Sequence, residues 1–151
     1  MNVGKICHRP AVTVSPGEDL TTVARLMRER HVGYLIVVDP KSPQSAPKPI
    51  GVLTDRDVVV TVLAREANAQ TLTAGDIMNS QPITVDETDS LRHALQTMRR
   101  AGVRRLPVLG RAGELAGIIA LDDIIDLLAG EIEEIAGVIR NEQRIEGILR
   151  T

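Results

Sequence analysis

The spacing of apolar residues alternates between two periods along the chain. In residues 20–27 and 91–98, apolar side chains recur every three or four positions, which places them on one face of an α-helix. Residues 34–38 and 105–109 are short, mostly apolar runs, which are typical of buried strands. Each run is followed, across a turn rich in Pro or Gly, by a second apolar run that predicts another strand. The pattern predicts a mixed α/β fold.

The alternation reflects an internal repeat. When the sequence is shifted by 71 residues, residues 3–38 align with residues 74–109, with ten identities in 36 positions. Beyond residue 38 the shift becomes 66, because the first copy has a longer loop over residues 39–49. The chain therefore consists of two copies of one unit and a tail.

Each copy is expected to form the order β-α-β-β-α. Residues 12–14 and 83–85 are short and β-branched, which predicts the first strand of each copy. Ser15 to Glu18 has the S-x-x-E spacing of a helix capping box, and Asp86 and Asp89 hold the matching places in the second copy. We therefore expect the first helix of each copy to be capped at these positions.

The last element of each copy can be assigned only by comparing the two copies. Residues 58–62 read Val-Val-Val-Thr-Val, which by propensity favours a strand. Their counterpart in residues 122–128 favours a helix that begins with acidic residues. We expect helices in both copies, over residues 55–65 and 121–129, because the repeat outweighs the local propensity.

These elements divide the chain into four expected segments. The first repeat covers residues 1–65, a linker covers 66–73, the second repeat covers 74–130, and a helical tail covers 131–151. The composition supports a folded protein, since 43% of the 151 residues are apolar, 25% are charged and the net charge is −2.

Composition and motifs exclude several classes of function. The near-neutral charge and the lack of Trp and Phe exclude nucleic-acid binding by phosphate neutralisation or base stacking. Apolar runs too short to span a bilayer, no signal peptide and a single cysteine lead us to expect a cytoplasmic protein with no membrane partner. The histidines are scattered without metal-ligand spacing, and the sequence has no P-loop or nucleophile motif. We therefore expect no enzyme, no metal and no required cofactor.

Both copies end in similar strand-to-helix junctions. Residues 51–57 read Gly-Val-Leu-Thr-Asp-Arg-Asp, and residues 117–123 read Gly-Ile-Ile-Ala-Leu-Asp-Asp. The strands that precede them, over residues 32–38 and 103–108, also correspond. Because the ordered set occurs twice, the chain resembles a tandem pair of cystathionine-β-synthase (CBS) domains over residues 3–130.

The resemblance implies a fold and a role. Paired CBS domains pack through their sheets into a pseudo-twofold module with two clefts, and modules commonly dimerise. Many bind adenosine compounds such as AMP, ADP, ATP, NAD or S-adenosylmethionine and transmit occupancy to an effector. We therefore expect a non-catalytic regulatory module that binds an adenosine nucleotide, forms a homodimer and signals to a partner protein.

The junction of the first copy has the chemistry of a nucleoside site. Asp57 is the ribose candidate, because a carboxylate can accept hydrogen bonds from both hydroxyls of a diol. Thr54 offers a hydroxyl to ribose or phosphate. The alternative for Asp57 is an ordinary first-turn acid that complements the helix dipole. Backbone groups near Val12 and Ile83 are expected to recognise adenine between aliphatic side chains.

Three arginines are candidates for phosphate binding, because the guanidinium fork binds phosphate oxygens bidentately. They are Arg56, Arg104 and Arg105, and their alternative is a solvated surface charge. In the family that the chain resembles, positions matching Arg56 and Arg104 often point toward a cleft. Gly33 and Tyr34 hold the places of Arg104 and Arg105 in the first copy, so no cation is expected there. Tyr34 is a candidate for a base edge, with a partly buried strand residue as the alternative.

The second copy departs from the first at one position. Ala120 stands where Thr54 stands in the first copy, so the hydroxyl is lost while Asp123 remains as a ribose candidate. We therefore expect the first copy to bind more tightly.

The tail has its own apolar stripe. Leu128, Ile132, Ile135 and Ile139 are spaced four, three and four residues apart, which is typical of an amphipathic helix, and Asn141 is expected to interrupt it. Packing within a homodimer is favoured over packing on another partner. The stripe also supports an alternative function, a dimerising scaffold with degenerate clefts whose C-terminal helix mediates protein contacts.

Overall fold

The computed structural model describes residues 1–150 and divides into two compact units. The first unit, residues 1–119, holds the strands of both sequence copies, and the second begins at Ala120. The first copy contains η1 (Val3–Lys5), β1 (Thr13–Val14), α1 (Leu20–Arg30), β2 (Tyr34–Val38), β3 (Pro49–Thr54), α2 (Asp55–Val58) and the π-helical turn η2 (Val59–Leu63). The second contains α3 (Ala74–Ile77), β4 (Val85–Asp86), α4 (Leu91–Ala101), β5 (Arg105–Leu109), β6 (Leu115–Ala120) and α5 (Leu121–Leu149). The predicted fold of two β-α-β-β-α repeats followed by a C-terminal helix is confirmed.

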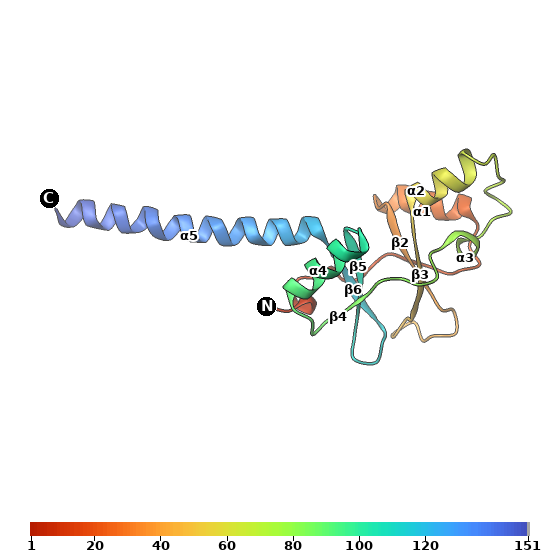
Figure 1. Ribbon diagram of the computed structural model, residues 1–151, viewed down its shortest axis with the longest axis horizontal. Coiled ribbons are helices and arrows are strands. Elements are labelled where there is room, and N and C mark those ends of the chain that lie inside the picture. The colour runs from red at the N-terminus through yellow and green to blue at the C-terminus, as the bar shows by residue number, and fades with distance from the viewer. Residues whose placement is uncertain (151) are drawn as a thin grey trace. The chain divides into compact units, whose positions relative to one another are not determined.

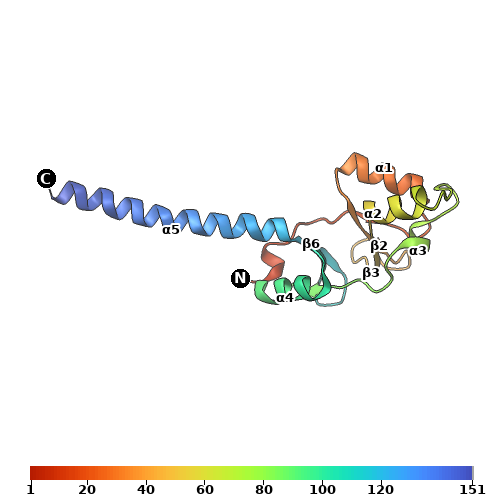
Figure 2. The same cartoon turned by 45° about the horizontal axis from the view of Figure 1, so that its top comes forward.

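Each copy forms a three-stranded sheet, in the order β1-β2-β3 and β4-β5-β6 (Figure 1). In the first sheet β1 runs parallel to β2, with Thr13 opposite Ile36, and β3 runs antiparallel to β2, with Tyr34 opposite Thr54. In the second sheet β4 runs parallel to β5 in the same way. Helices α1 and α2 lie side by side near the first sheet in both views (Figure 1 and Figure 2).

The two copies exchange their N-terminal segments. The N–H of Val3 donates to the carbonyl oxygen of Asp89 at 2.9 Å, and 71 residues later the N–H of Ala74 donates to that of Glu18 at 2.8 Å. Further along, His8 pairs with β6 and Asn79 pairs with β3 through reciprocal backbone hydrogen bonds of 2.8–3.1 Å. The start of each copy therefore binds the sheet of the other, which makes the two copies one folding unit.

The core of the first copy follows the predicted helical face with one exception. Leu20, Val23 and Met27 of α1 are buried among residues of β2 and β3. The helical spacing of the apolar segment 20–27 also predicts Ala24 on this face, but Ala24 is exposed, because the buried face is centred on the other three positions. The predicted core face is therefore one residue too wide.

The predicted capping boxes are wrong by a few residues. Helix α1 is capped by Asp19, whose carboxylate accepts the N–H of Thr22 at 2.9 Å, and α4 by Ser90. The segment from Ser15 to Glu18 instead forms a turn whose carbonyl oxygens accept N–H groups of the second copy. The S-x-x-E spacing therefore marks a contact between the copies, and the helix begins after it.

The β-branched run after Asp55 is helical, as the repeat predicts. Residues 55–58 form α2 and residues 59–63 continue as the π-helical turn η2. Val58 and Val62 are partly buried against the core of the first copy in this conformation. Tertiary packing thus overrides the strand propensity of the run.

The second unit is one continuous helix, α5. The interruption predicted at Asn141 is wrong, because its side chain accepts a hydrogen bond from Arg144 at 3.0 Å and stays on the helix surface. Among residues 1–150, no helix has both the length and the apolar character needed to cross a bilayer.

Candidate functional site

Three strands bring candidate residues to one end of the first sheet. Because β1 and β2 are parallel, Val12 and Tyr34 lie at the same end, and the carbonyl oxygen of Val12 accepts the N–H of Ile36 at 3.2 Å. Because β3 is antiparallel, its last residue, Thr54, lies at this end opposite Tyr34. The first turn of α2, with Asp57, follows directly. We call this group, made of Val12, Tyr34, Thr54 and Asp57, the sheet-end site.

Thr54 and Asp57 form a reciprocal capping box at the start of α2. The N–H of Thr54 donates to Oδ2 of Asp57 at 2.8 Å, and the N–H of Asp57 donates to Oγ1 of Thr54 at 3.2 Å. Both side chains are half-buried. Each carboxylate oxygen has two lone pairs, so the cap leaves Asp57 able to accept hydroxyl groups as well. The box fixes where that carboxylate points.

Gly33 allows the start of α2 to lie close to the end of the sheet. Its carbonyl oxygen accepts the N–H of Asp55 at 3.0 Å, and a Cβ added at Gly33 would lie 2.7 Å from Oδ2 of Asp55. Gly33 is a predicted binding residue and holds the place that Arg104 holds in the second copy. The structure shows that Gly33 makes room for the carboxylate of Asp55. Asp55 is not among the predicted site residues, and its only signal in the sequence is its place directly after the strand.

Tyr34 and Arg105 come from equivalent positions of the two copies, and the charge of one acts on the other. Burial raises the pKa of Tyr34 well above its usual range, and the positive charge of Arg105 partly offsets this effect. Arg105 begins β5 and is exposed. The second copy therefore supplies a cation whose charge acts on Tyr34 of the sheet-end site.

The other candidates are distributed as follows. Arg56 is exposed in the first turn of α2, beside Asp57. Ile83 and Arg104 precede β4 and β5, at the end of the second sheet that corresponds to the sheet-end site, and both are exposed. The structure therefore places Arg56 with the sheet-end site, and Ile83 and Arg104 at the equivalent end of the second sheet.

The second unit contains the remaining ribose candidate. The N–H of Ala120 donates to Oδ2 of Asp123 at 3.0 Å, which matches one half of the box formed by Thr54 and Asp57. Ala120 has no hydroxyl, so the other half of the box cannot form. The cap of α5 therefore has one of the two hydrogen bonds that form the cap of α2.

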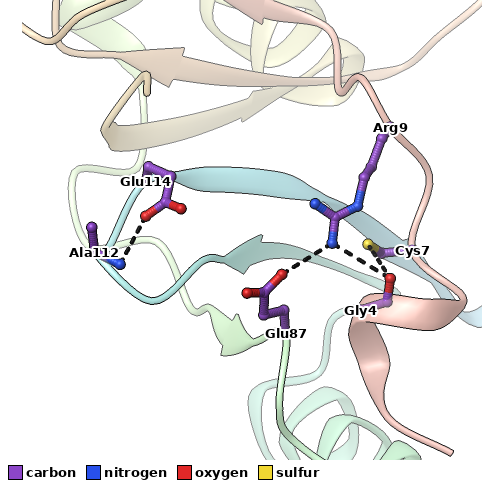
Figure 3. Close-up of polar contacts among 6 residues, drawn as sticks. All are labelled: Gly4, Cys7, Arg9, Glu87, Ala112 and Glu114. Carbon is purple, nitrogen blue, oxygen red and sulfur yellow. Dashed lines mark hydrogen bonds and ion pairs between the residues drawn. The ribbon is translucent and has the colours of Figure 1, made fainter. Parts of the chain in front are cut away.

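Among the polar contacts drawn in Figure 3, the one between Arg9 and Glu87 joins the first residues of the chain to the second copy. Arg9 donates to Oε2 of Glu87 at 3.2 Å and to the carbonyl oxygen of Gly4 at 3.4 Å. The hydrogen bond that Arg9 donates to Glu87 raises the pKa of Arg9. These contacts hold the exchanged segment in place, a role that the sequence does not signal.

Two cavities of the first unit lie away from Thr54 and Asp57. One of about 340 Å³ is lined by Thr13, Arg25 and Glu29 among others. Another of about 500 Å³ lies between Arg9 and Gly117. Neither includes Thr54 or Asp57, so neither adds support to the predicted ribose contact. Within residues 1–150, no group of three His, Cys, Asp or Glu side chains is placed to hold a metal ion.

Comparison with known families gives a match over most of the chain. The model of the CBS domain matches residues 3–64 and residues 74–130. An uncharacterized protein of Methanopyrus kandleri is 35% identical over 137 residues, which cover 89% of this chain and 67% of that protein.

Two proteins link the sequence to solved structures. Hypoxic response protein 1 of Mycobacterium tuberculosis is 34% identical over 124 residues, covering 82% of this chain and 78% of that protein. A crystal structure of Hypoxic Response Protein I, with two coordinated zinc ions, has a TM-score of 0.72 at 31% identity and covers 83% of this chain and 98% of its own. A CBS domain protein of Pyrobaculum aerophilum, complexed with AMP, has a TM-score of 0.73 at 28% identity, covering 82% of this chain and 89% of that one.

Proposed function

Since the chain belongs to the CBS domain family, with two copies in tandem, we propose that it is a non-catalytic sensor of an adenosine nucleotide. The ligand occupies the sheet-end site of the first copy. Binding changes the conformation of the module, and a separate effector protein responds to that change. We also propose that the protein is located in the cytoplasm and forms a homodimer.

The convergence of Val12, Tyr34, Thr54 and Asp57 at one end of the first sheet carries this proposal. The backbone at Val12 is suited to an adenine edge, and the carboxylate of Asp57 to the two ribose hydroxyls. The exposed guanidinium groups of Arg56 and of Arg105, whose charge acts on Tyr34, are suited to phosphate. The AMP complex of the Pyrobaculum aerophilum protein, which shares this fold, supports the choice of ligand class.

The second copy is proposed as the weaker site. Ala120 lacks the hydroxyl that Thr54 supplies in the first copy, while Asp123 retains the carboxylate. AMP, ADP and ATP share the diol and the anionic group that these residues would bind, and NAD and S-adenosylmethionine share the adenosine. The proposal therefore names the adenosine nucleotides as a class.

A second candidate function is a dimerising scaffold whose clefts bind no nucleotide. The observation in its favour is the long apolar stripe of α5, which lies outside both sheets and is exposed. Under this alternative α5 is the working surface of the protein. Nucleotide titration separates the two functions.

Isothermal titration calorimetry with AMP, ADP, ATP, NAD, S-adenosylmethionine and adenosine tests the sensor. We expect the phosphate-bearing compounds to bind more tightly than adenosine and to lose affinity as salt rises, because charge pairs are screened over about 10 Å at 0.1 M. Arg56→Ala should reduce the difference in affinity between AMP and adenosine, and Arg56→Lys should restore part of that difference. Arg65→Ala, an exposed charge beyond η2, is the matched control.

Two results would count against the proposal. Adenosine binding as tightly as AMP would show that the arginines are surface charges. No binding of any of these compounds at millimolar concentration would reject the sensor in favour of the scaffold.

A further inference from the structure

The long loop of the first copy has no counterpart of equal length in the second copy. The shift of the repeat falls from 71 to 66 residues across the loop, so the first copy has five extra residues there. The loop is held by its own hydrogen bonds. The N–H of Asp39 donates to the carbonyl oxygen of Lys48 at 2.8 Å, and the N–H of Lys48 donates to Oγ of Ser42 at 3.0 Å. Its shape is therefore defined by the chain itself.

This loop reaches the second copy and encloses a cavity there. The N–H of Leu115, the first residue of β6, donates to the carbonyl oxygen of Pro47 at 2.7 Å. The cavity of about 500 Å³ lies between the loop, the segment 9–13 that follows His8, and the start of β6. Its volume is within the range of about 300–1,000 Å³ that is typical of small-molecule sites. We call it the loop cavity.

The lining of the loop cavity is mainly apolar and carries one charge. Among the described residues that line it, Arg9 is the one charged side chain, and Thr13 and Gln44 add a hydroxyl and an amide. No carboxylate lines it, so it lacks the group that Asp57 offers to a ribose diol. The other lining residues are Pro10, Ala11, Pro47, Leu115, Ala116 and Gly117. This chemistry is suited to a ligand with an apolar body and a single anionic group.

Arg9 is positioned to bind an anion without losing its present partners. Its Nη2 donates to Oε2 of Glu87 at 3.2 Å and to the carbonyl oxygen of Gly4 at 3.4 Å (Figure 3). Nη1 and Nε take no part in these two bonds, and the side chain is 46% exposed. A guanidinium that is already held in place loses less conformational freedom when a ligand binds. Because Glu87 offsets part of its charge, a monoanion suits Arg9 better than a phosphate dianion.

The second copy lacks both of these features at the equivalent place. Ser80 stands where Arg9 stands in the first copy, so the cation is missing. The matching loop, residues 110–114, lacks the five extra residues that bring Gln44 and Pro47 to the cavity. The cation and the extra wall therefore occur together, on one side of the repeat.

We propose that the loop cavity binds a small organic carboxylate with an aliphatic or cyclic apolar body, and that Arg9 binds its carboxylate group. The site is separate from the sheet-end site, because Val12, Tyr34, Thr54 and Asp57 do not line it. A bound ligand contacts the loop of the first copy and β6 of the second copy together. Its occupancy therefore stabilises the contact between the two copies.

A titration followed by ¹H–¹⁵N NMR of the full-length chain tests the site, with cyclohexanecarboxylate as the probe and cyclohexanecarboxamide as its uncharged control. We expect the carboxylate to shift the amide signals of Ala11, Leu115 and Gly117, and the carboxamide to bind more weakly. Saturating AMP should leave the carboxylate able to bind. This result does not depend on whether AMP itself binds, so the two proposals can fail separately.

Matched variants separate ligand binding from the structural role of Arg9. Arg9→Gln should weaken carboxylate binding about tenfold or more, because charge-assisted hydrogen bonds are lost. Glu87→Gln breaks the same ion pair but keeps the guanidinium, and should bind the carboxylate as tightly as the unaltered protein or more tightly. Ala116→Leu should block binding by filling the cavity, with Ala24→Leu on the exposed surface of α1 as its control. The NMR spectrum of each variant shows whether the fold is retained.

Several results would overturn the proposal. Equal affinity for the carboxylate and the carboxamide would show that Arg9 binds no anion. Equal losses for Arg9→Gln and Glu87→Gln would show that the ion pair is only structural. Competitive displacement of the carboxylate by AMP would place it in the nucleotide site, and shifts confined to residues 131–149 would place it on α5. No shift at millimolar concentration would also reject the site.

Discussion

One carboxylate at the sheet-end site serves two purposes. In the capping box the carboxylate of Asp57 accepts the backbone N–H of Thr54. In the proposed complex the same carboxylate also accepts hydrogen bonds from two ribose hydroxyls. The two roles are compatible, because a carboxylate has about four acceptor positions and the box engages one of them. The structural and functional interpretations of this residue are therefore not exclusive.

Asp57→Ala is expected to lower AMP affinity more than Asp123→Ala does. Only the first copy has a Thr hydroxyl beside the acid, and loss of hydrogen bonds to a charged group costs about 1.5–3 kcal/mol, or roughly 10- to 150-fold in affinity. Isothermal titration calorimetry measures both variants.

The control for this comparison is Asp76→Ala. Thr73 and Asp76 form the same capping box at the start of α3, with a 2.8 Å hydrogen bond from the N–H of Thr73. This variant removes an equivalent cap away from the site and should leave AMP affinity unchanged. Equal losses for Asp57→Ala and Asp123→Ala would contradict the ranking of the two copies.

A titratable cap makes the stability of α1 dependent on pH. Hydrogen bonds from the N–H and the hydroxyl of Thr22 lower the pKa of Asp19 below 3.8. A carboxylate with a lowered folded-state pKa stabilises the fold above its unfolded pKa, and this contribution is lost as the pH falls through the folded value. Asp19→Asn should therefore lower the free energy of unfolding at neutral pH, and the difference should shrink as the pH falls below 3.8.

Urea denaturation at several pH values measures this effect. Ser90 caps α4 with a group that does not titrate in this range, accepting the N–H of His93 at 3.1 Å. Ser90→Ala should cost about 1 kcal/mol regardless of pH. A difference for Asp19→Asn that stays constant down to acidic pH would contradict the assignment.

At the level of secondary-structure elements, two glycines allow the exchange of segments between the copies. A Cβ at Gly117 of β6 would overlap the backbone carbonyl oxygen of His8, and one at Gly51 of β3 would overlap the side chain of Met78. These glycines align in the repeat, and each lies under the first segment of the other copy. The repeat thus preserves a glycine where the exchanged segment crosses the sheet.

Gly117→Ala is expected to destabilise the protein more than Gly51→Ala. The obstacle at Gly117 is backbone that is hydrogen-bonded to β6, whereas the obstacle at Gly51 is mainly a flexible methionine. Overpacking of this kind costs about 1–3 kcal/mol, measured as the free energy of unfolding in urea.

A compensating variant tests the cause. Met78→Ala combined with Gly51→Ala should recover part of the loss at Gly51, because the shorter side chain clears the space. A smaller loss for Gly117→Ala than for Gly51→Ala would show that the exchanged segment moves easily.

At the level of the whole molecule, two similar copies have diverged in chemistry. The first copy keeps Thr54 and Tyr34, whereas the second has Ala120 and Arg105 at the same places. A symmetric fold thus carries one complete and one partial set of candidate groups. The helix α5, with its own stripe, is a third functional element.

Deletion of residues 131–151 is expected to separate sensing from assembly. If α5 pairs with a second copy, the truncated protein should have a weaker dimer or lower solubility while its AMP affinity changes less than about twofold, since the sheet-end site lies in residues 12–57. Light scattering and calorimetry measure the two properties. A full-length protein that is monomeric across micromolar concentrations would contradict the homodimer.

The sequence by itself determined the repeat, the order of the elements, the grouping of Thr54 with Asp57 and the stripe of α5. All of these are encoded in the spacing of side chains along short segments, where helix and strand periods act directly. Only the tertiary structure decided that each copy completes the sheet of the other and that Gly33 accommodates Asp55. These features depend on backbone hydrogen bonds and close approaches between residues far apart in the chain, and such contacts require no particular side-chain pattern in either partner.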